Sequence, residues 1–452
     1  MAGWCLVSRP NATLMVRANA IVPAPTSRFG TKRLYRDAGS MASSSVANAL
    51  LGIGFWAIAA KIFPPAQLGV MTAVLAVIVS VGVVIAAGVG DAYAALFPAA
   101  GDDRRRFYRI GQRTFLALAV VSGVVAAVCT TRLLQAVHGS VGVGILVAVG
   151  ILVWSRLALQ NATLVALGRA SWLPAASIAV SVIKIVLLPI LAVTIAWHAV
   201  ELSFALSAIV VVLILRPMVA RVIDTGDELP TTTIPGGLTV RTFNKFVGQT
   251  VLSSALSMGL LTVTPFVVAV FAGPKQGALF SLALSIVQAL DFIGAALATS
   301  LVVHASSAPE EADTMARAIL IRAVALAAVG AAVLIAVAPL GLRLLNPQYG
   351  AMGATGVIAA LSVAAIFHCV YLVWAALQRS RRNMKTPLVF DGIAAAVLVA
   401  TMPFLCREHG ALGGAWAVLL AQLALTVGIA VHFLATTRRQ RLGKRHVSAG
   451  AN

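Results

Sequence analysis

The residues best suited to chemistry are ionisable side chains inside long apolar stretches. Arg156 lies midway along an apolar stretch near 142–167, with Gln160 one turn further on the same helical face. Lys184 lies in the middle of the next stretch. Because an ionised side chain at the centre of a bilayer costs on the order of 2.5–3.5 kcal/mol, each must face protein or water. Guanidinium and ammonium groups hold phosphates well, so we predict that Arg156, Lys184 and Gln160 bind an anionic substrate.

Three aspartates in apolar stretches are candidates for carrying a coupling proton or ion. Asp291 lies in the middle of one stretch, whereas Asp91 and Asp391 lie nearer the ends of theirs. The alternative for these aspartates, and for Arg156 and Lys184, is that they form internal ion pairs that fix helix packing, or reach toward the membrane surface. This alternative applies especially to Asp91 and Asp391. His368 is interpreted as structural.

The motifs of common enzymes and metal sites are missing from the sequence. The only Gly-Lys pair, Gly443-Lys444, is followed by Arg445 and lacks the spacing of a phosphate-binding loop. The cysteines are scattered without CxxC spacing, which supports neither a zinc site nor a disulfide framework. We therefore predict no catalytic residue, no metal and no cofactor.

The elements that position these residues must be membrane-spanning helices. Of the 452 residues, 60% are hydrophobic and 11% are charged, with a mean hydropathy of +0.96. One soluble core cannot bury so much apolar surface, and a spanning helix needs about 20 such residues. Twelve spans are predicted, near 40–62, 69–97, 114–131, 142–167, 172–196, 202–220, 246–272, 276–303, 317–341, 353–377, 386–405 and 412–436.

Basic residues predict the orientation. The net charge of +20 would suggest nucleic acid in a soluble protein, but here the basic residues lie between apolar stretches, so no nucleic-acid partner is expected. Alternate connections are rich in arginine, as in 104–113, and we predict that these and both chain ends are cytoplasmic. The predicted organisation is a disordered basic tail (1–37), a six-helix lobe (38–221), a cytoplasmic connector (222–245), a second six-helix lobe (246–436) and a basic tail (437–452).

An internal repeat relates the two halves. The turn Phe63-Pro64-Pro65-Ala66-Gln67-Leu68-Gly69 and the turn Phe271-Ala272-Gly273-Pro274-Lys275-Gln276-Gly277 occupy the same place between the first two spans of each half. Six spans per half give both halves the same orientation, so the pseudo-two-fold axis runs along the membrane normal. The alternative is that glycine and proline merely mark turns.

Several segments together resemble a known family. They are Arg36-Asp37-Ala38, the aromatic-rich segment 55–69 ending in its short outer turn, Gly88-Val89-Gly90 before the arginine-rich loop, Ala166-Leu167-Gly168-Arg169, and the segment 410–417 that opens the last span. This pattern is similar to the polysaccharide-transport branch, the O-antigen type flippases, of the multidrug/oligosaccharidyl-lipid/polysaccharide (MOP) exporter superfamily. The resemblance extends from about Arg36 to Thr436.

The resemblance implies a flippase in the cytoplasmic membrane that moves a polyprenyl-pyrophosphate-linked oligosaccharide by alternating access, not an enzyme. Its implied partners are that lipid-linked saccharide, membrane lipids and glycan-assembly enzymes. Arg156 and Lys184 match no sharp family motif; their assignment rests on membrane depth and charge. Two alternatives stay open: a cation-coupled multidrug exporter of the same superfamily, which Asp291 favours, and a non-transporting scaffold for glycan-assembly enzymes.

Overall fold

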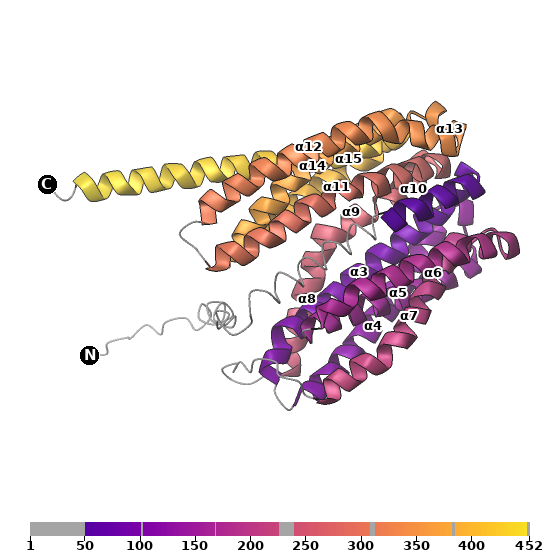
Figure 1. Ribbon diagram of the computed structural model, residues 1–452, viewed down its shortest axis with the longest axis horizontal. Helices are drawn as coiled ribbons and strands as arrows, with labels where there is room; N and C mark the ends of the chain where they lie inside the picture. Colours follow the sequence, from indigo (N-terminus) through magenta and orange to yellow (C-terminus); the bar gives the residue numbers. More distant parts are fainter. Residues whose placement is uncertain are drawn as a thin grey trace, which may run out of the picture.

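The computed structural model describes residues 50–100, 103–167, 169–225, 239–307, 312–381 and 385–449. The predicted tail 1–37, the first part of the first predicted span and most of the predicted connector lie outside these ranges. Within them the chain is built from helices joined by short turns (Figure 1).

A first group of helices surrounds one central helix, α3 (Pro65–Ala100). Ser140 caps the start of α5 by accepting a hydrogen bond from the backbone of Val143, and a proline occupies the first turn of α6. Besides the helix Leu50–Ile62, the other members of this group are α4 (Arg104–Leu133), α5 (Val141–Ala166), α6 (Leu173–Thr194) and α7 (Ala199–Thr225).

A second group contains the helices of the C-terminal half. Its long last helix breaks at Gly410, whose φ of 61° lies in the left-handed region that glycine adopts without strain. The predicted basic tail continues this helix as far as Ala449. The members are α11 (Pro274–Ser307), α12 (Ala312–Leu345), the short α13 (Pro347–Ala351), α14 (Ala354–Ser380) and α15 (Lys385–Ala449).

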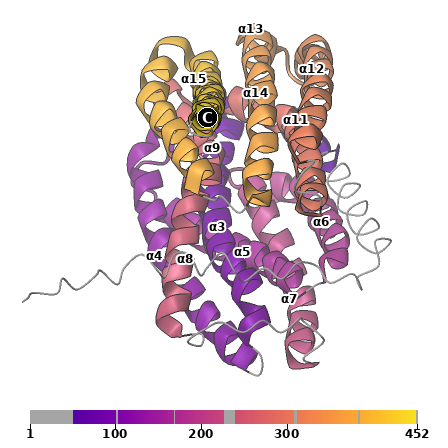
Figure 2. The same ribbon diagram turned by 90° about the vertical axis from the view of Figure 1, so that its left-hand side faces the viewer.

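The predicted span 246–272 is a broken helix that belongs to both groups. It consists of α8 (Val240–Ser254), a π-helical turn (Ala255–Gly259), α9 (Leu260–Thr262) and α10 (Thr264–Ala272), with a bend of 48° before α10. Its first part, α8, packs on α3, whereas α10 packs on α11 and α15. Figure 2 shows α8 beside the first group.

Eight described helices are long and apolar enough to cross a membrane, and nine if the bent α8–α10 pair is one span. One of these eight, α15, covers both predicted spans 386–405 and 412–436. The structure therefore supports a polytopic helical protein, and the number twelve stays a prediction.

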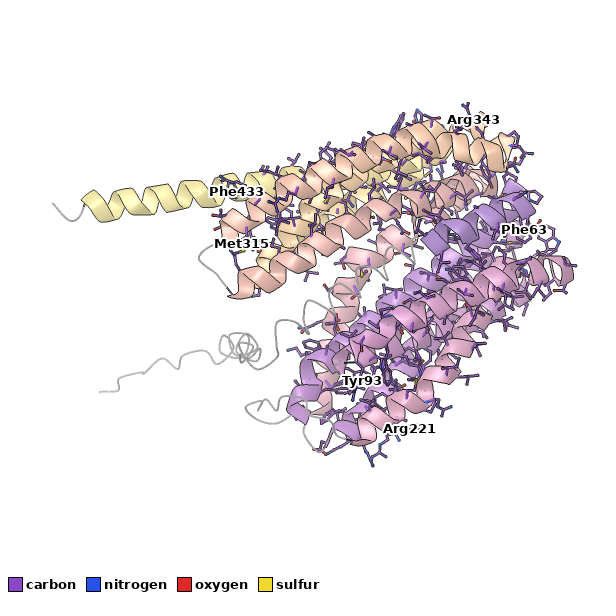
Figure 3. The ribbon with its side chains drawn as sticks, viewed as in Figure 1. Phe63, Tyr93, Arg221, Met315, Arg343 and Phe433 are labelled. Atoms are coloured by element: carbon purple, nitrogen blue, oxygen red, sulfur yellow. The ribbon has the colours of Figure 1, made fainter. Side chains whose placement is uncertain are left out.

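The two groups converge at one end and diverge at the other. Phe63 and Arg343 lie at the converging end, and Tyr93, Arg221, Met315 and Phe433 mark the diverging one (Figure 3). At the converging end the groups touch so closely that a Cβ added to Gly69 would lie 1.7 Å from the carbonyl oxygen of Pro274. We call the diverging, arginine-rich end the inner end, because it is the one predicted to be cytoplasmic.

Candidate functional site

Lys184 lies in an aromatic cage inside the first helix group. Its ammonium nitrogen is 4.5 Å from the ring centre of Phe204 on α7 and 5.2 Å from that of Phe55. The two rings meet edge to face, and Trp154 of α5 packs 5.5 Å from Phe204. Aromatic faces stabilise a cation without neutralising it. Among the described residues Lys184 makes no ion pair, so this cage keeps a positive charge within the helix group.

Arg156 lies in a groove between α4, α5 and α7. Its guanidinium donates a hydrogen bond to the side-chain oxygen of Gln112, and Gln112 in turn donates to the hydroxyl of Tyr93. The groove has a volume of about 400 Å³ and an otherwise apolar lining that includes Leu116 and Leu213. These two residues at the rim are 51% and 60% exposed, so the groove opens sideways, on the lateral surface of the first group.

Gln160 connects two helices. Its amide donates a hydrogen bond to the backbone oxygen of Val212 on α7, and its own side-chain oxygen is buried without a hydrogen-bond partner among the described residues. The residue is 2% exposed. In this conformation the geometry of Gln160 is that of a link between α5 and α7.

The structure does not bring Arg156 and Lys184 together. Trp154 faces the cage of Lys184, and a residue two positions further along a helix points about 200° away around its axis. Arg156 therefore faces the opposite side of α5 from the cage. The prediction of one shared cationic lumen is not what this conformation displays.

Asp291 and Asp391, in contrast, join one polar cluster in the second helix group. Asp291 on α11 lies 2.9 Å from Nδ1 of His368 on α14. The ring of His368 stacks on that of Tyr371 at 6.1 Å, and the Tyr371 hydroxyl donates a 2.5 Å hydrogen bond to Asp391 on α15. We call these four residues, with Gln422, the carboxylate cluster.

Small cavities lie beside the carboxylate cluster. One, of about 40 Å³, is lined by His368, Tyr371, Asp391 and Gln422, together with Ser257 of the π-helical turn. A neighbouring cavity touches Asp291. The side-chain oxygen of Gln422 is buried without a hydrogen-bond partner among the described residues. A space of this size holds a water or a small cation between oxygen ligands.

Asp91 is separate from the carboxylate cluster. It lies on α3 in the first helix group and is exposed. The structure thus unites two of the three predicted ion-coupling aspartates. Across the described residues no three His, Cys, Asp or Glu side chains gather as metal ligands would.

Sequence reasoning missed several of these partners. Tyr371 follows His368 by one helical turn, and that spacing was the available signal for a shared face. It also missed Glu201, a carboxylate 1% exposed at the start of α7, 3.6 Å from Nδ1 of His198. Interaction with Glu201 raises the pKa of His198 above its usual range, against the opposing effect of burial.

Solved structures of the same overall fold were found by comparison. They include the lipid II flippase MurJ in an inward closed conformation (TM-score 0.69, 14% identity, 85% of this chain and 86% of that one). An inward-facing multidrug resistance MATE family transporter of the MOP superfamily matches with a TM-score of 0.65 and 18% identity, over 88% of this chain and 95% of that one. A MOP superfamily transporter from Pyrococcus furiosus matches with a TM-score of 0.55 and 17% identity, over 89% of this chain and 95% of that one. It is described as having a binding pocket of reversed polarity.

No family model and no curated protein matches the chain. At these identities the structural neighbours define the fold alone. The chain has the all-α polytopic fold of the MOP exporters, with two helical lobes, which confirms the predicted fold class. We now call the first and second helix groups the N-lobe and the C-lobe.

Proposed function

We propose that this protein is a transporter of the cytoplasmic membrane that moves a lipid-linked oligosaccharide or polysaccharide precursor across the bilayer by alternating access. Both chain ends are proposed to be cytoplasmic. The cargo's pyrophosphate is the group that the protein recognises, and glycan-assembly enzymes supply the cargo. Transport needs no catalytic residue in this scheme.

The observation that carries this proposal is the caged ammonium of Lys184. It lies over Phe204 and Phe55 inside the N-lobe with no carboxylate partner among the described residues. A charge held among aromatic side chains without an ionic partner is expensive to keep, and it attracts an anion. A pocket for organic cations would carry the opposite charge.

The structural neighbours support the proposal at the level of the fold. One is named a lipid II flippase, and another is described by a binding pocket of reversed polarity. The caged lysine of this chain fits an anionic cargo. The roles predicted for Arg156 and Gln160 in binding cargo remain predictions.

The test is export of surface glycan in a host whose own copy of the gene is deleted. Lys184→Ala should lower export about tenfold or more, the effect of losing one charge-assisted hydrogen bond to phosphate. Lys184→Arg, which keeps the charge, should retain a substantial part of the wild-type glycan export. The matched control is Lys61→Ala, because Lys61 is exposed at the outer end of the helix Leu50–Ile62. Normal export by Lys184→Ala, with protein in the membrane, would contradict the proposal.

The second candidate is a cation-coupled multidrug exporter, and the carboxylate cluster is the observation that favours it. Its two aspartates lie beside cavities in the C-lobe. Under the first proposal these groups carry the coupling proton or cation, while Asp91 is a predicted third. Drug sensitivity of the deletion host separates the two candidates: resistance to organic cations restored by the wild-type protein, without restored glycan, would favour drug export.

A further inference from the structure

The groove that holds Arg156 faces away from the site proposed for cargo. Its floor is α5 and its walls are α4 and α7, which barely touch each other. The rim residues Leu116 and Leu213 are more than half exposed. In a membrane this surface faces lipid, so the groove is filled from the bilayer and not from the space between the lobes.

The position of the guanidinium along the membrane is set by its partner. Gln112 lies next to Arg113, the last basic residue of α4 before the apolar stretch that begins at Phe115. Arg156 therefore lies near the inner boundary of the hydrocarbon, although it is midway along α5. This is the depth of the phosphates and glycerols of the inner leaflet.

Further arginines flank the inner end of the groove. Arg113 lies one turn from the lining residue Leu116, and Arg216 lies one turn from Leu213, each toward the inner end. Both arginines are exposed. An apolar channel with three guanidinium groups around one end matches a molecule with a hydrocarbon chain and a negative head.

We propose that this groove binds an anionic phospholipid of the inner leaflet, with its phosphate on Arg156 and one acyl chain along the apolar lining. Basic pockets between spanning helices on the cytoplasmic side bind anionic lipid head groups for the same physical reason. The guanidinium offers a fork that fits two phosphate oxygens. A lipid held here braces α4 against α7 while the lobes move.

The inference does not depend on the cargo. Arg156 and the cage of Lys184 are on opposite sides of α5, so a saccharide attached to a lipid in this groove would be outside the N-lobe. The occupant is therefore a resident membrane lipid, and its binding is measured without transport.

The experiment measures lipids that remain on the purified full-length protein. The protein is reconstituted in vesicles of phosphatidylcholine and phosphatidylglycerol, extracted in mild detergent, and its bound lipids are counted by native mass spectrometry. We expect the wild-type protein to retain phosphatidylglycerol in preference to phosphatidylcholine. In Arg156→Ala that retention should fall about tenfold, the loss of one charge-assisted hydrogen bond. Retention by Arg156→Lys should lie between these two values, because lysine keeps the charge but lacks the planar pair of donors of a guanidinium.

Two further variants separate loss of the site from loss of the fold. Val153→Trp fills the groove without changing its charge and should also release the lipid. Arg132→Ala removes an exposed arginine at the other end of α4 and should retain lipid as the wild type does. The unfolding temperature of each variant in lipid-free detergent shows whether it is folded.

Three results would overturn the inference. One is equal phosphatidylglycerol retention by the wild type, Arg156→Ala and Val153→Trp when all are folded. Another is the absence of any preference for phosphatidylglycerol in the wild type. The third is retention of an added polyprenyl phosphate in place of phosphatidylglycerol, since that would make the groove part of the cargo site.

Discussion

The carboxylate cluster joins residues that are 100 positions apart in the chain. Asp291 contacts His368, Asp391 accepts a hydrogen bond from the Tyr371 hydroxyl, and the rings of His368 and Tyr371 stack on each other. We predict that the two carboxylates act together in coupling, because this chain of contacts connects them. At the scale of single residues we therefore predict that each carboxylate is needed for coupling.

We expect Asp291→Asn and Asp391→Asn each to lose gradient-driven transport, because the amide neither ionises nor takes up a proton. Exchange of cargo without a gradient should persist, since the lobes and the cage of Lys184 are unchanged. The measurement is uptake into vesicles under an imposed proton or sodium gradient, with Glu408→Gln as the matched control because its side chain is 72% exposed. Full gradient-driven uptake by both aspartate variants would remove the cluster from the coupling scheme.

The broken span between α8 and α10 is the element that belongs to both lobes. Its inner part is attached to α3 by two hydrogen bonds, from Ser80 to the backbone oxygen of Gly259 at 2.6 Å and from Thr250 to that of Gly88 at 2.9 Å. The π-helical turn frees backbone groups at this point, and such turns frequently accompany function. A movement of one lobe must bend or shift this element.

Ser80→Ala should therefore loosen the π-helical turn from α3. Ser80 is 5% exposed, and losing its hydrogen bond should lower the free energy of unfolding by about 0.5–1.5 kcal/mol. Unfolding temperatures in detergent provide the measurement. Ser285→Ala is the control, because among the described residues the Ser285 hydroxyl donates its hydrogen bond to Ser281 of the same helix. An equal fall of the unfolding temperature in both variants would show that the hydrogen bond between α3 and the π-helical turn stabilises the protein no more than one within a single helix.

The sequence predicts the ends of most spans and not their breaks. The apolar stretch predicted at 172–196 is α6 (Leu173–Thr194), because bilayer thickness fixes the length of an apolar helix. The span 246–272 contains no charged residue, so hydropathy does not locate its 48° bend, although Pro265 in the first turn of α10 was an available signal. The two parts of the span also contact different lobes.

For the candidate site, sequence reasoning finds the charged residues and not their surroundings. The positions of Arg156, Lys184 and Asp291 deep in apolar stretches identify them as ionisable residues that must face protein or water. Which helix face meets which neighbour is decided by packing between elements far apart in the chain. Arg156 and Lys184 therefore fell into one predicted site, although α5 separates them.

At the scale of the whole molecule, the lobes touch at the outer end and diverge at the inner end. At the outer end Gly69 lies so close to Pro274 that no side chain fits on Gly69. Any added atom must push the two outer turns apart. Since alternating access exchanges contact at one end for contact at the other, such a change should favour the opposite conformation.

Gly69→Ala should accordingly bring the inner ends of the lobes closer. We expect spin labels on cysteines at Arg109 of α4 and Asp313 of α12, both exposed, to approach by about 5 Å or more, the scale of a one-turn helix shift. The native cysteines are first replaced. Gly52→Ala is the control, because no atom lies within 4 Å of the added Cβ there. Unchanged label distances in Gly69→Ala would mean that the outer contact does not govern the equilibrium.

The contact between Gly69 and Pro274 joins the two copies of the repeated turn to each other. If one ancestral turn gave rise to both, that turn had to be complementary to its own copy. After duplication the two copies were not independent: bulk gained in one had to be matched by space in the other. In an alignment of relatives, the positions of Gly69 and Pro274 should therefore covary in size, and a larger residue at the first should accompany a displaced or shortened turn at the second.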